Sequence, residues 1–205
     1  MFIQIGYTLF RLNCGVILGL ILALPVAILM STTPTLRRLI NPSVSICSNV
    51  PVIVWIPFAV MLVGTEEAFK VSLVAISAFF ITTTMVFDAA AKTHLPFLEA
   101  GRALHFHGLT LIRHVVLPAV LPAVIGALRA SIAFGWVVVF FVEYASARAG
   151  SEGLGWRIAD ARSMGRIEEE FAGLILLGIV ALLLDRLVNY GQKRALSWMH
   201  IAEVT

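Results

Sequence analysis

A polar segment at residues 99–122 holds most of the side chains in this sequence that could do chemistry. It reads EAGRALHFHGLTLIRHVVLPAVLP, with three histidines, two arginines and one glutamate. His105 and His107 invite a metal site, but residues two apart on a helix point about 200° apart and cannot share one ion. We therefore expect histidines that face water or a partner, and no metal site.

The motifs of nucleotide binding and nucleophilic catalysis are missing from the sequence. No Gly-x-x-x-x-Gly-Lys-Ser/Thr phosphate loop occurs in the 205 residues, so the chain is not expected to bind ATP by that device. Ser146, Ser151 and Ser163 lack the histidine and aspartate arrangement of an activated nucleophile. We predict a chain that is not an enzyme and holds no cofactor of its own.

The composition places the chain in a lipid bilayer. Hydrophobic residues make up 60% of it and charged residues 13%, against about 45–50% and about 25% in ordinary soluble domains. A soluble core of this size cannot bury so much apolar surface. The net charge of +3 is small and dispersed, which gives no reason to expect nucleic acid as a partner.

Five apolar runs could cross a membrane, which takes about 20 mainly apolar residues for about 30 Å of hydrocarbon. These runs are residues 12–36, 39–65, 71–87, 115–142 and 171–184, the last extended to about residue 190. We predict an all-α, polytopic membrane protein of about five spanning helices in a single domain, residues 1–205. The abrupt start before the first run suggests that a sixth, N-terminal helix is absent from this chain.

Basic residues in the short connections indicate the orientation, because the cytoplasmic side of a membrane protein is rich in lysine and arginine. Three connections on one side hold Arg37 and Arg38, then Lys92, Arg102 and Arg113, then Lys193 and Arg194. We expect this side to be cytoplasmic and residues 146–170 to form an extracytoplasmic loop. That loop holds four arginines of its own, which weigh against this orientation.

The spacing within residues 97–113 predicts a short amphipathic helix followed by a turn. Glu99, Arg102, Thr110 and Arg113 recur at helical spacing on one face, and Pro118 is suited to start the next helix. Such a helix is too polar to span. It either lies on the lipid headgroups or docks a soluble partner, and the pattern alone leaves both open.

The same segment resembles the cytoplasmic loop of permease subunits of ATP-binding-cassette (ABC) importers. That family's pattern is Glu-Ala-Ala, three residues, Gly, nine residues, Ile, one residue, Leu-Pro. This chain has, at the same spacings, Glu99-Ala100-Gly101, His105 in the Gly slot, Val115 in the Ile slot, and Leu117-Pro118.

Further motifs, in order along the chain, resemble the nitrate/sulfonate/taurine-type branch of these permeases. They are NVPVIVWIP at 49–57, LPAVLP at 117–122, GALR at 126–129, Trp136, Glu143, GLG at 153–155, DAR at 160–162 and LDR at 184–186. The resemblance covers about residues 11–198, nearly the whole chain.

This resemblance implies that residues 92–117 form a cytoplasmic loop whose coupling helix docks on an ATPase subunit. The implied ATPase-coupling residues are Glu99, Ala100, Gly101, Arg102, Leu104, His105, Phe106, Gly108, Leu117 and Pro118, with Phe106 and Leu109 as apolar anchors.

The implied partners are two ATPase subunits that bind ATP and Mg²⁺, a second permease copy in a homodimer, membrane lipid, and a periplasmic or lipid-anchored solute-binding protein docked at 146–170. The implied location is the bacterial inner membrane.

The path of the solute is expected along polar and aromatic residues of the spans. The translocation-pathway candidates are Asn49, Trp55, Phe79, Phe80, Thr83, Arg129 and Trp136. Arg129 lies within a span, where an unpaired charge costs at least ~2.5–3.5 kcal/mol. It either contacts an anionic solute or pairs with Asp185. Glu143 is expected near the outer interface, cheaply solvated, with a structural or gating role.

We therefore predict a permease subunit of an ATP-driven importer for a small, anionic or zwitterionic solute, such as nitrate, a sulfonate, taurine or bicarbonate, that works by alternating access. Two alternatives stay open: a secondary carrier that works alone, and a membrane scaffold that only recruits a cytoplasmic partner. A secondary carrier is disfavoured because the chain shows no internal repeat and few carboxylates in mid-membrane.

Overall fold

The fold is a bundle of long helices. The computed structural model describes residues 2–64, 67–106, 108–146 and 152–195, and within them it shows helices and no strand. Four of these helices are long and apolar enough to cross a membrane: α1 (Phe2–Thr32), α4 (Glu67–Ala103), α6 (Leu117–Ala145) and α8 (Ile167–Ala195). This confirms the predicted all-α membrane fold.

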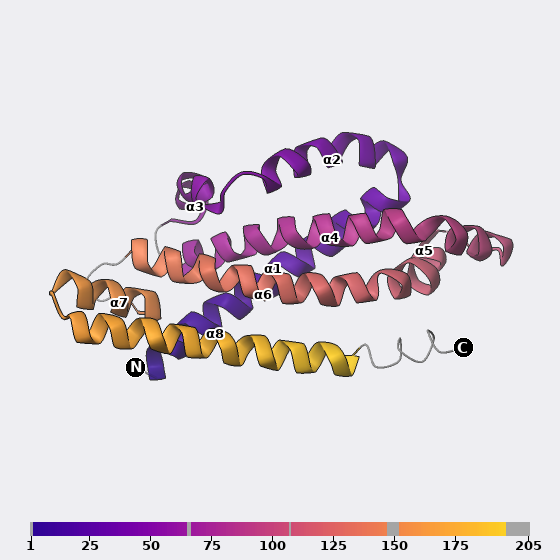
Figure 1. Cartoon of the computed structure of the whole chain (residues 1–205). Coiled ribbons are helices and arrows are strands. Elements are labelled where there is room, and N and C mark those ends of the chain that lie inside the picture. The colour runs from indigo at the N-terminus through magenta and orange to yellow at the C-terminus, as the bar shows by residue number, and fades with distance from the viewer. Residues whose placement is uncertain (1, 65–66, 107, 147–151, 196–205) are drawn as a thin grey trace.

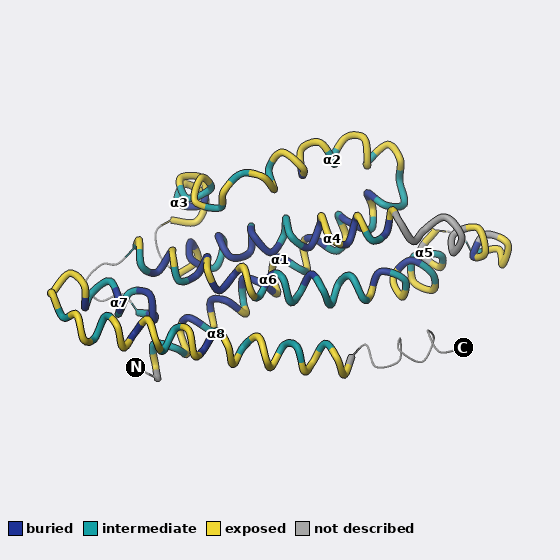
Figure 2. Tube along the Cα trace, in the orientation of Figure 1, coloured by how far each residue is buried: buried dark blue, intermediate teal, exposed yellow. Residues whose placement is uncertain are grey.

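Helix α4 is central to the bundle. It packs along α1 on one side and along α6 on the other, and α8 lies beside α6 (Figure 1). Buried residues follow the facing sides of α1, α4 and α6 (Figure 2). In α8, by contrast, only 6% of the most apolar stretch of 18 residues is buried. Helix α8 is therefore a peripheral helix within the isolated chain.

The predicted span 39–65 is not one straight helix. It consists of α2 (Pro34–Ser48), a short 3₁₀ helix, η1 (Val52–Trp55), and α3 (Ile56–Val63), and its two parts are bent by 106°. Pro51 removes a backbone donor at the break, and it disfavours helical geometry at Val50. The predicted five spans are thus four long helices and one broken pair, which arches away from α4 (Figure 1).

Small residues let α1 and α4 approach closely. Gly15, Gly19, Ala23 and Ala27 recur every fourth residue along α1, and both alanines are fully buried. A Cβ added at Gly19 would lie 2.6 Å from the carbonyl oxygen of Ala75. Interfaces of this kind hold membrane helices together through van der Waals packing, because lipid offers no hydrophobic drive between helices.

The two ends of the bundle differ in what they hold. At one end the short helix α7 (Leu154–Ser163) packs against α1, α6 and α8. At the other end a turn joins α4 to α5 (Gly108–Leu111), followed by a π-helical turn, η2 (Ile112–Val116). The three basic connections gather at this second end (Figure 1).

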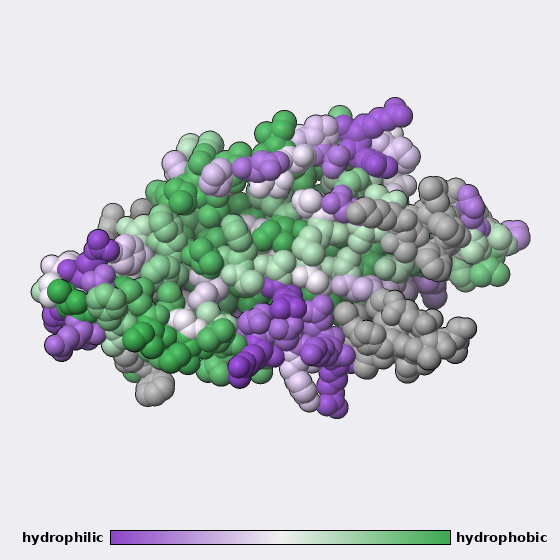
Figure 3. All heavy atoms as spheres, viewed as in Figure 1, coloured by the Kyte–Doolittle hydropathy of each residue, from purple (hydrophilic) through white to green (hydrophobic). Residues whose placement is uncertain are grey.

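Figure 3 shows the distribution of hydropathy over one face of the molecule. Hydrophobic residues cover much of the bundle, and hydrophilic ones gather over α2, at the turn between α7 and α8 and over the C-terminal part of α8. This is the distribution expected of a chain whose middle lies in hydrocarbon.

Candidate coupling hairpin and translocation face

Residues 99–118, called here the coupling hairpin, begin inside α4 rather than in a helix of their own. Helix α4 runs without a break to Ala103, and His105 then takes a left-handed conformation with φ of 61°. The N–H of Phe106 donates to the carbonyl oxygen of Gly101 (3.0 Å), which satisfies one of the last carbonyls of the helix. This is the geometry of a glycine-type helix end.

The predicted separate helix over 97–113 is therefore wrong. Good helix formers such as Leu98, Glu99 and Arg102 extend the spanning helix, and the turn at His105 separates them from Thr110 and Arg113. The family pattern explains this turn, because its Gly slot falls on the residue that adopts positive φ. Histidine here costs about 1–2 kcal/mol relative to a residue without strain.

Gly101 packs directly against the returning helical segment of the hairpin, residues 108–116. A Cβ at this position would lie 2.7 Å from Cδ1 of Leu111 and 2.9 Å from Cγ2 of Val115. Gly101 and Val115 are the two positions where this chain has smaller residues than the family pattern, and they face each other. The two departures together make a closely packed hairpin.

A wider helical turn leads into Pro118. The N–H of Leu117 donates to the carbonyl oxygen of Ile112, five residues back, and Pro118 occupies the first turn of α6. Proline has no N–H to donate and its ring crowds the carbonyl four residues earlier, so the chain before it opens from α to π spacing. Such π turns are frequent at functional sites.

The tip of the hairpin is exposed although its base is packed. Glu99, Ala100, His105 and Gly108 are exposed, and the apolar side chain of Leu104 is 68% exposed. Phe106 is half-buried and stacks on His114, with ring centroids 5.7 Å apart.

Leu117 at the base is also exposed. The side chains of Arg102 and Leu109 lie outside the described part of the chain.

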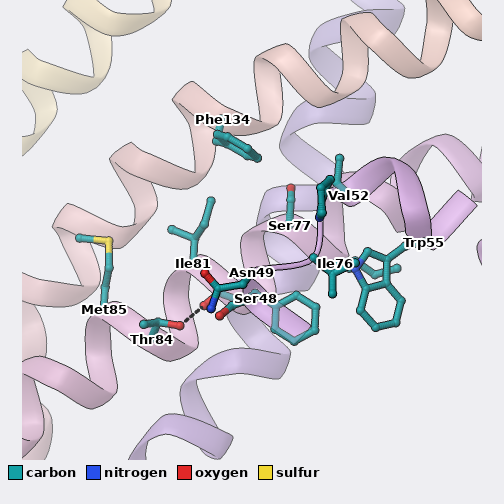
Figure 4. A pocket seen from close by; sticks show the side chains of 13 residues that line it. Ser48, Asn49, Val52, Trp55, Ile76, Ser77, Ile81, Thr84, Met85 and Phe134 are labelled. Carbon is teal, nitrogen blue, oxygen red and sulfur yellow. Dashed lines mark hydrogen bonds between the residues drawn. The ribbon is translucent and has the colours of Figure 1, made fainter. Parts of the chain in front are cut away.

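Three of the predicted pathway residues line one pocket, which we call the bend pocket. Asn49 and Trp55 come from the break between α2 and α3 (Figure 4), and Phe80 comes from α4. The pocket has a volume of about 530 Å³, within the range of about 300–1,000 Å³ typical of small-molecule sites. The remaining lining residues are Ser48, Val50, Pro51, Val52, Ile76, Ser77, Ile81, Thr84, Met85 and Phe134.

The other predicted pathway residues lie elsewhere. Phe79 lines an apolar groove between α1, α3 and α4. Thr83 is fully buried, and its hydroxyl has no hydrogen-bond partner among the described residues. Arg129 and Trp136 line a third pocket, between α6 and α8. The structure thus distributes the predicted path over separate faces of the bundle.

Arg129 pairs with Asp185, one of the two alternatives that the sequence left open. A guanidinium nitrogen of Arg129 lies 3.2 Å from a carboxylate oxygen of Asp185, whose other oxygen accepts from Asn189 (3.1 Å). Both charged side chains are partly exposed, 41% and 51%. The pair links α6 to α8 at the edge of their shared pocket.

Glu143 is not solvated as the sequence analysis expected. It is 1% exposed and binds Arg11, which is equally buried, at 2.5 Å. Its carboxylate also accepts from the hydroxyl of Thr8 and from the N–H of Gly155. We call Thr8, Arg11 and Glu143, together with Glu67 at their edge, whose side chain is 60% exposed, the buried ion cluster.

The cluster joins four helices at the α7 end of the bundle. Arg11 in α1 also binds Glu67 at the start of α4 (2.5 Å) and the backbone carbonyl of Glu152 before α7 (2.6 Å). Lys70 binds the same Glu67 at 2.9 Å. Because buried charges must be paired and hydrogen-bonded to be tolerated, these contacts fix the helices relative to one another.

The glycines of the sequence Gly153-Leu154-Gly155 let α7 sit on Glu143. Gly153 has φ of 122°, and a Cβ there would collide with the carboxylate of Glu143. A Cβ on Gly155 would lie 2.6 Å from the carbonyl oxygen of Phe140. Leu154 between them is fully buried.

Sequence reasoning missed Thr8, Arg11 and Glu67. Arg11 and Glu67 each lie at the end of an apolar run, where a charged residue is most simply interpreted as solvated at the membrane interface. A usable signal was present nonetheless, since Arg11 is the single basic residue in the first 36 positions and therefore needs a partner.

The chain matches one protein family over most of its length. Residues 15–196 match the model of the binding-protein-dependent transport system inner membrane component. The chain belongs to this family. This confirms the resemblance drawn from the coupling hairpin and the later motifs.

Three relatives of this chain are named for the solute that they transport. SsuC of Bacillus subtilis, named for aliphatic sulfonates transport, is 28% identical over 99% of this chain and 72% of its own. The taurine transport system permease protein TauC of Escherichia coli is 24% identical over 95% and 70%. The nitrate import permease protein NrtB of Leptolyngbya laminosa is 24% identical over 95% and 68%. The chain is thus similar to permeases named for the transport of sulfonates, taurine and nitrate.

The fold of the permease is also that of a solved transporter. A chain of the MetNI methionine ABC transporter, solved in inward-facing conformations, superposes with a TM-score of 0.75 at 22% identity, over 94% of this chain and 92% of that one. The fold of this chain is therefore also found in a solved ABC transporter.

Proposed function

We propose that the permease is the membrane subunit of an ATP-driven importer that moves a small anionic or zwitterionic solute inward by alternating access. Two copies of this chain form the path, two ATPase subunits that bind ATP and Mg²⁺ dock on the coupling hairpins, and a solute-binding protein docks at residues 146–170. The transport functions named for the relatives support the solute class, and the inward-facing conformations of the MetNI transporter support the transport cycle. The family's description as an inner membrane component supports the location in the bacterial inner membrane.

The observation that carries the proposal is the contrast within the coupling hairpin. Its base is held by Gly101 against Leu111 and Val115, so it moves with α4 and α6. Its outer face exposes Glu99, and its tip exposes the apolar side chain of Leu104. A packed base and an exposed apolar tip are what a rigid element needs to receive the motion of another subunit.

ATP hydrolysis by the reconstituted complex tests this role. Reversing one charge with Glu99→Arg is expected to lower solute-stimulated hydrolysis at least about tenfold, because a charge reversed in an interface meets repulsion and unpaired partners. Lys193→Glu is the matched control, since it reverses a charge on α8 at the same end of the bundle. Assembly of the complex is measured separately by size-exclusion chromatography.

The alternatives give different results in the same assay. Unchanged hydrolysis and assembly with Glu99→Arg would mean that the hairpin lies on lipid headgroups and docks no ATPase. Solute uptake on an ion gradient by the permease alone would identify a secondary carrier. A complex that assembles but hydrolyses ATP without any response to solute would identify a scaffold.

A further inference from the structure

The bend pocket combines polar and aromatic walls without a formal charge. Hydroxyl and amide groups come from Ser48 and Asn49 at the end of α2 and from Ser77 and Thr84 on α4, and none of the described lining residues is acidic or basic. Figure 4 shows Ser48, Asn49 and Thr84 grouped together, with Trp55 at the other side of the pocket. The electrostatic potential in this pocket therefore depends on the directions of the hydroxyl and amide protons of its lining side chains.

The hydroxyl protons point away from the pocket. Ser48 donates to the carbonyl of Ser45 (3.0 Å), Ser77 to that of Val74 (2.8 Å) and Thr84 to that of Phe80 (2.8 Å). A carbonyl can only accept, so each hydroxyl uses its single proton there and offers lone pairs to the cavity.

The amide of Asn49 and the helix end act in the same direction. Its nitrogen donates to the carbonyl of Ser45 (2.7 Å), which leaves the amide oxygen and one N–H. The pocket also lies at the C-terminal end of α2, the negative end of the helix dipole. Among the polar side chains of the pocket, acceptors thus outnumber donors.

Aromatic rings complete the site. Trp55 and Phe80 lie with ring centroids 5.7 Å apart, and Phe134 lines the same pocket. Ring faces attract cations, most strongly when the site is partly desolvated. Lone pairs, a helix C-terminus and aromatic faces are the surroundings that suit a hydrogen-bond-donating ammonium group, and they disfavour an oxyanion.

We infer that the bend pocket is a transit site for the ammonium group of a zwitterionic solute, an amino-sulfonate or amino acid rather than a simple anion such as nitrate. This inference rests on the proposed import function and narrows its solute class. The absence of a carboxylate among the described lining residues makes the site weak, and a weak site allows a solute to enter and to leave.

Three probes, two of them of matched shape, test the inference on the permease–ATPase complex in nanodiscs, without a binding protein. Taurine and 1-propanesulfonate share their shape, with an ammonium group in the first and a methyl group in the second. Saturation-transfer NMR is expected to give taurine about tenfold tighter binding than 1-propanesulfonate, which is the size of a cation–aromatic contribution. Nitrate is expected not to displace taurine at equal concentration.

Variants locate the effect. Thr84→Val keeps the shape of an exposed side chain and removes its lone pairs, so it should weaken taurine binding about threefold or more and leave 1-propanesulfonate unchanged. Ser31→Ala is the control, because Ser31 also donates to a carbonyl of its own helix, that of Ile28, but lies outside the pocket. Replacing Trp55 by Leu should also lower the preference for taurine.

The inference is wrong if 1-propanesulfonate or nitrate binds as tightly as taurine, if none of the probes binds, or if Thr84→Val has no effect. These outcomes are independent of the hydrolysis assay. A permease that fails to couple through Glu99 could still show the preference for ammonium, and a coupled importer could lack it.

Discussion

The two ends of the bundle differ in whether their charged side chains are buried or exposed. At the α7 end, Arg11 and Glu143 are each 1% exposed and are paired inside the chain. At the other end, the coupling hairpin leaves Glu99 and Leu104 at the surface. The same helix, α4, connects both ends.

This difference shows which end is complete within the isolated chain. The buried ion cluster has its partners within the chain and fixes α1, α4, α6 and α7 to one another. The hairpin has a packed base and an exposed apolar tip, which is how a surface looks before a partner covers it. Mutations should therefore affect stability at the α7 end and interaction at the hairpin end.

The largest effect on stability is expected from breaking the buried ion pair. Glu143→Leu removes the buried carboxylate that binds Arg11 and leaves the guanidinium with the exposed Glu67 as its remaining charged partner, at a cost of up to about 3–5 kcal/mol. The double variant Arg11→Met with Glu143→Leu should recover at least half of this loss, because no charge is then left uncompensated. Thermal unfolding in nanodiscs, followed by tryptophan fluorescence, measures both. Equal stability of the single variant and the native chain would mean that the cluster does not fix the helices.

A smaller loss is expected where α7 meets α6. Gly155→Ala places a Cβ against the carbonyl oxygen of Phe140, and overpacking of this kind costs about 1–3 kcal/mol. Gly178→Ala in α8 is the control, since a Cβ there meets nothing within 4 Å. The same unfolding experiment should show a lowered midpoint for the first variant and an unchanged or raised one for the second. A midpoint lowered equally in both variants would show that the loss does not come from overpacking between α7 and α6.

At the hairpin end the expected change has the opposite sign. His105→Gly relieves the left-handed conformation and should stabilise the chain by about 1 kcal/mol. Ala103→Gly, in the last turn of α4, should destabilise it by about 0.5–1 kcal/mol because that residue is helical. Comparison of the two unfolding midpoints checks the sign. A destabilised His105→Gly variant would show that the imidazole makes contacts worth more than the backbone strain.

The smallest effect on stability concerns the pair between α6 and α8. Exchanging the charges with Arg129→Asp and Asp185→Arg keeps the attraction between the two side chains. The free energy of unfolding should therefore change by less than about 1 kcal/mol, as for other partly exposed pairs. Import by the exchanged variant then separates the roles. Retained import supports a structural pair, whereas lost import with intact assembly places Arg129 on the solute path.

Local features of the fold were predictable from the sequence. The apolar runs predicted the long helices, and the alignment with the family pattern placed His105 in a glycine slot, although the turn itself was expected after residue 113. His105 stands in the slot where the family has glycine, and it adopts the positive φ that glycine favours. Each of these features depends on residues close in sequence, for which spacing and side-chain chemistry suffice.

Features that depend on distant residues were not predictable. Arg11 binds Glu67 and Glu143, which are 56 and 132 residues away, and a single sequence contains no information on such pairs. The prolines at 51 and 57 were visible, but the bend of 106° depends on how α3 packs against α4. The predicted pathway residues were scattered for the same reason, because helical faces were unknown.

Helix α4 has a mechanical consequence that follows from its length. It is continuous over 37 residues, about 55 Å, from Glu67 in the buried ion cluster to Ala103 at the coupling hairpin. A tilt of about 10° around its midpoint would displace each tip by about 5 Å. Because α1 packs closely against α4 through glycine and alanine residues, we expect the two helices to move together. A displacement of α4 at Glu99 would then also displace Arg11, which binds Glu67 at the opposite end of α4.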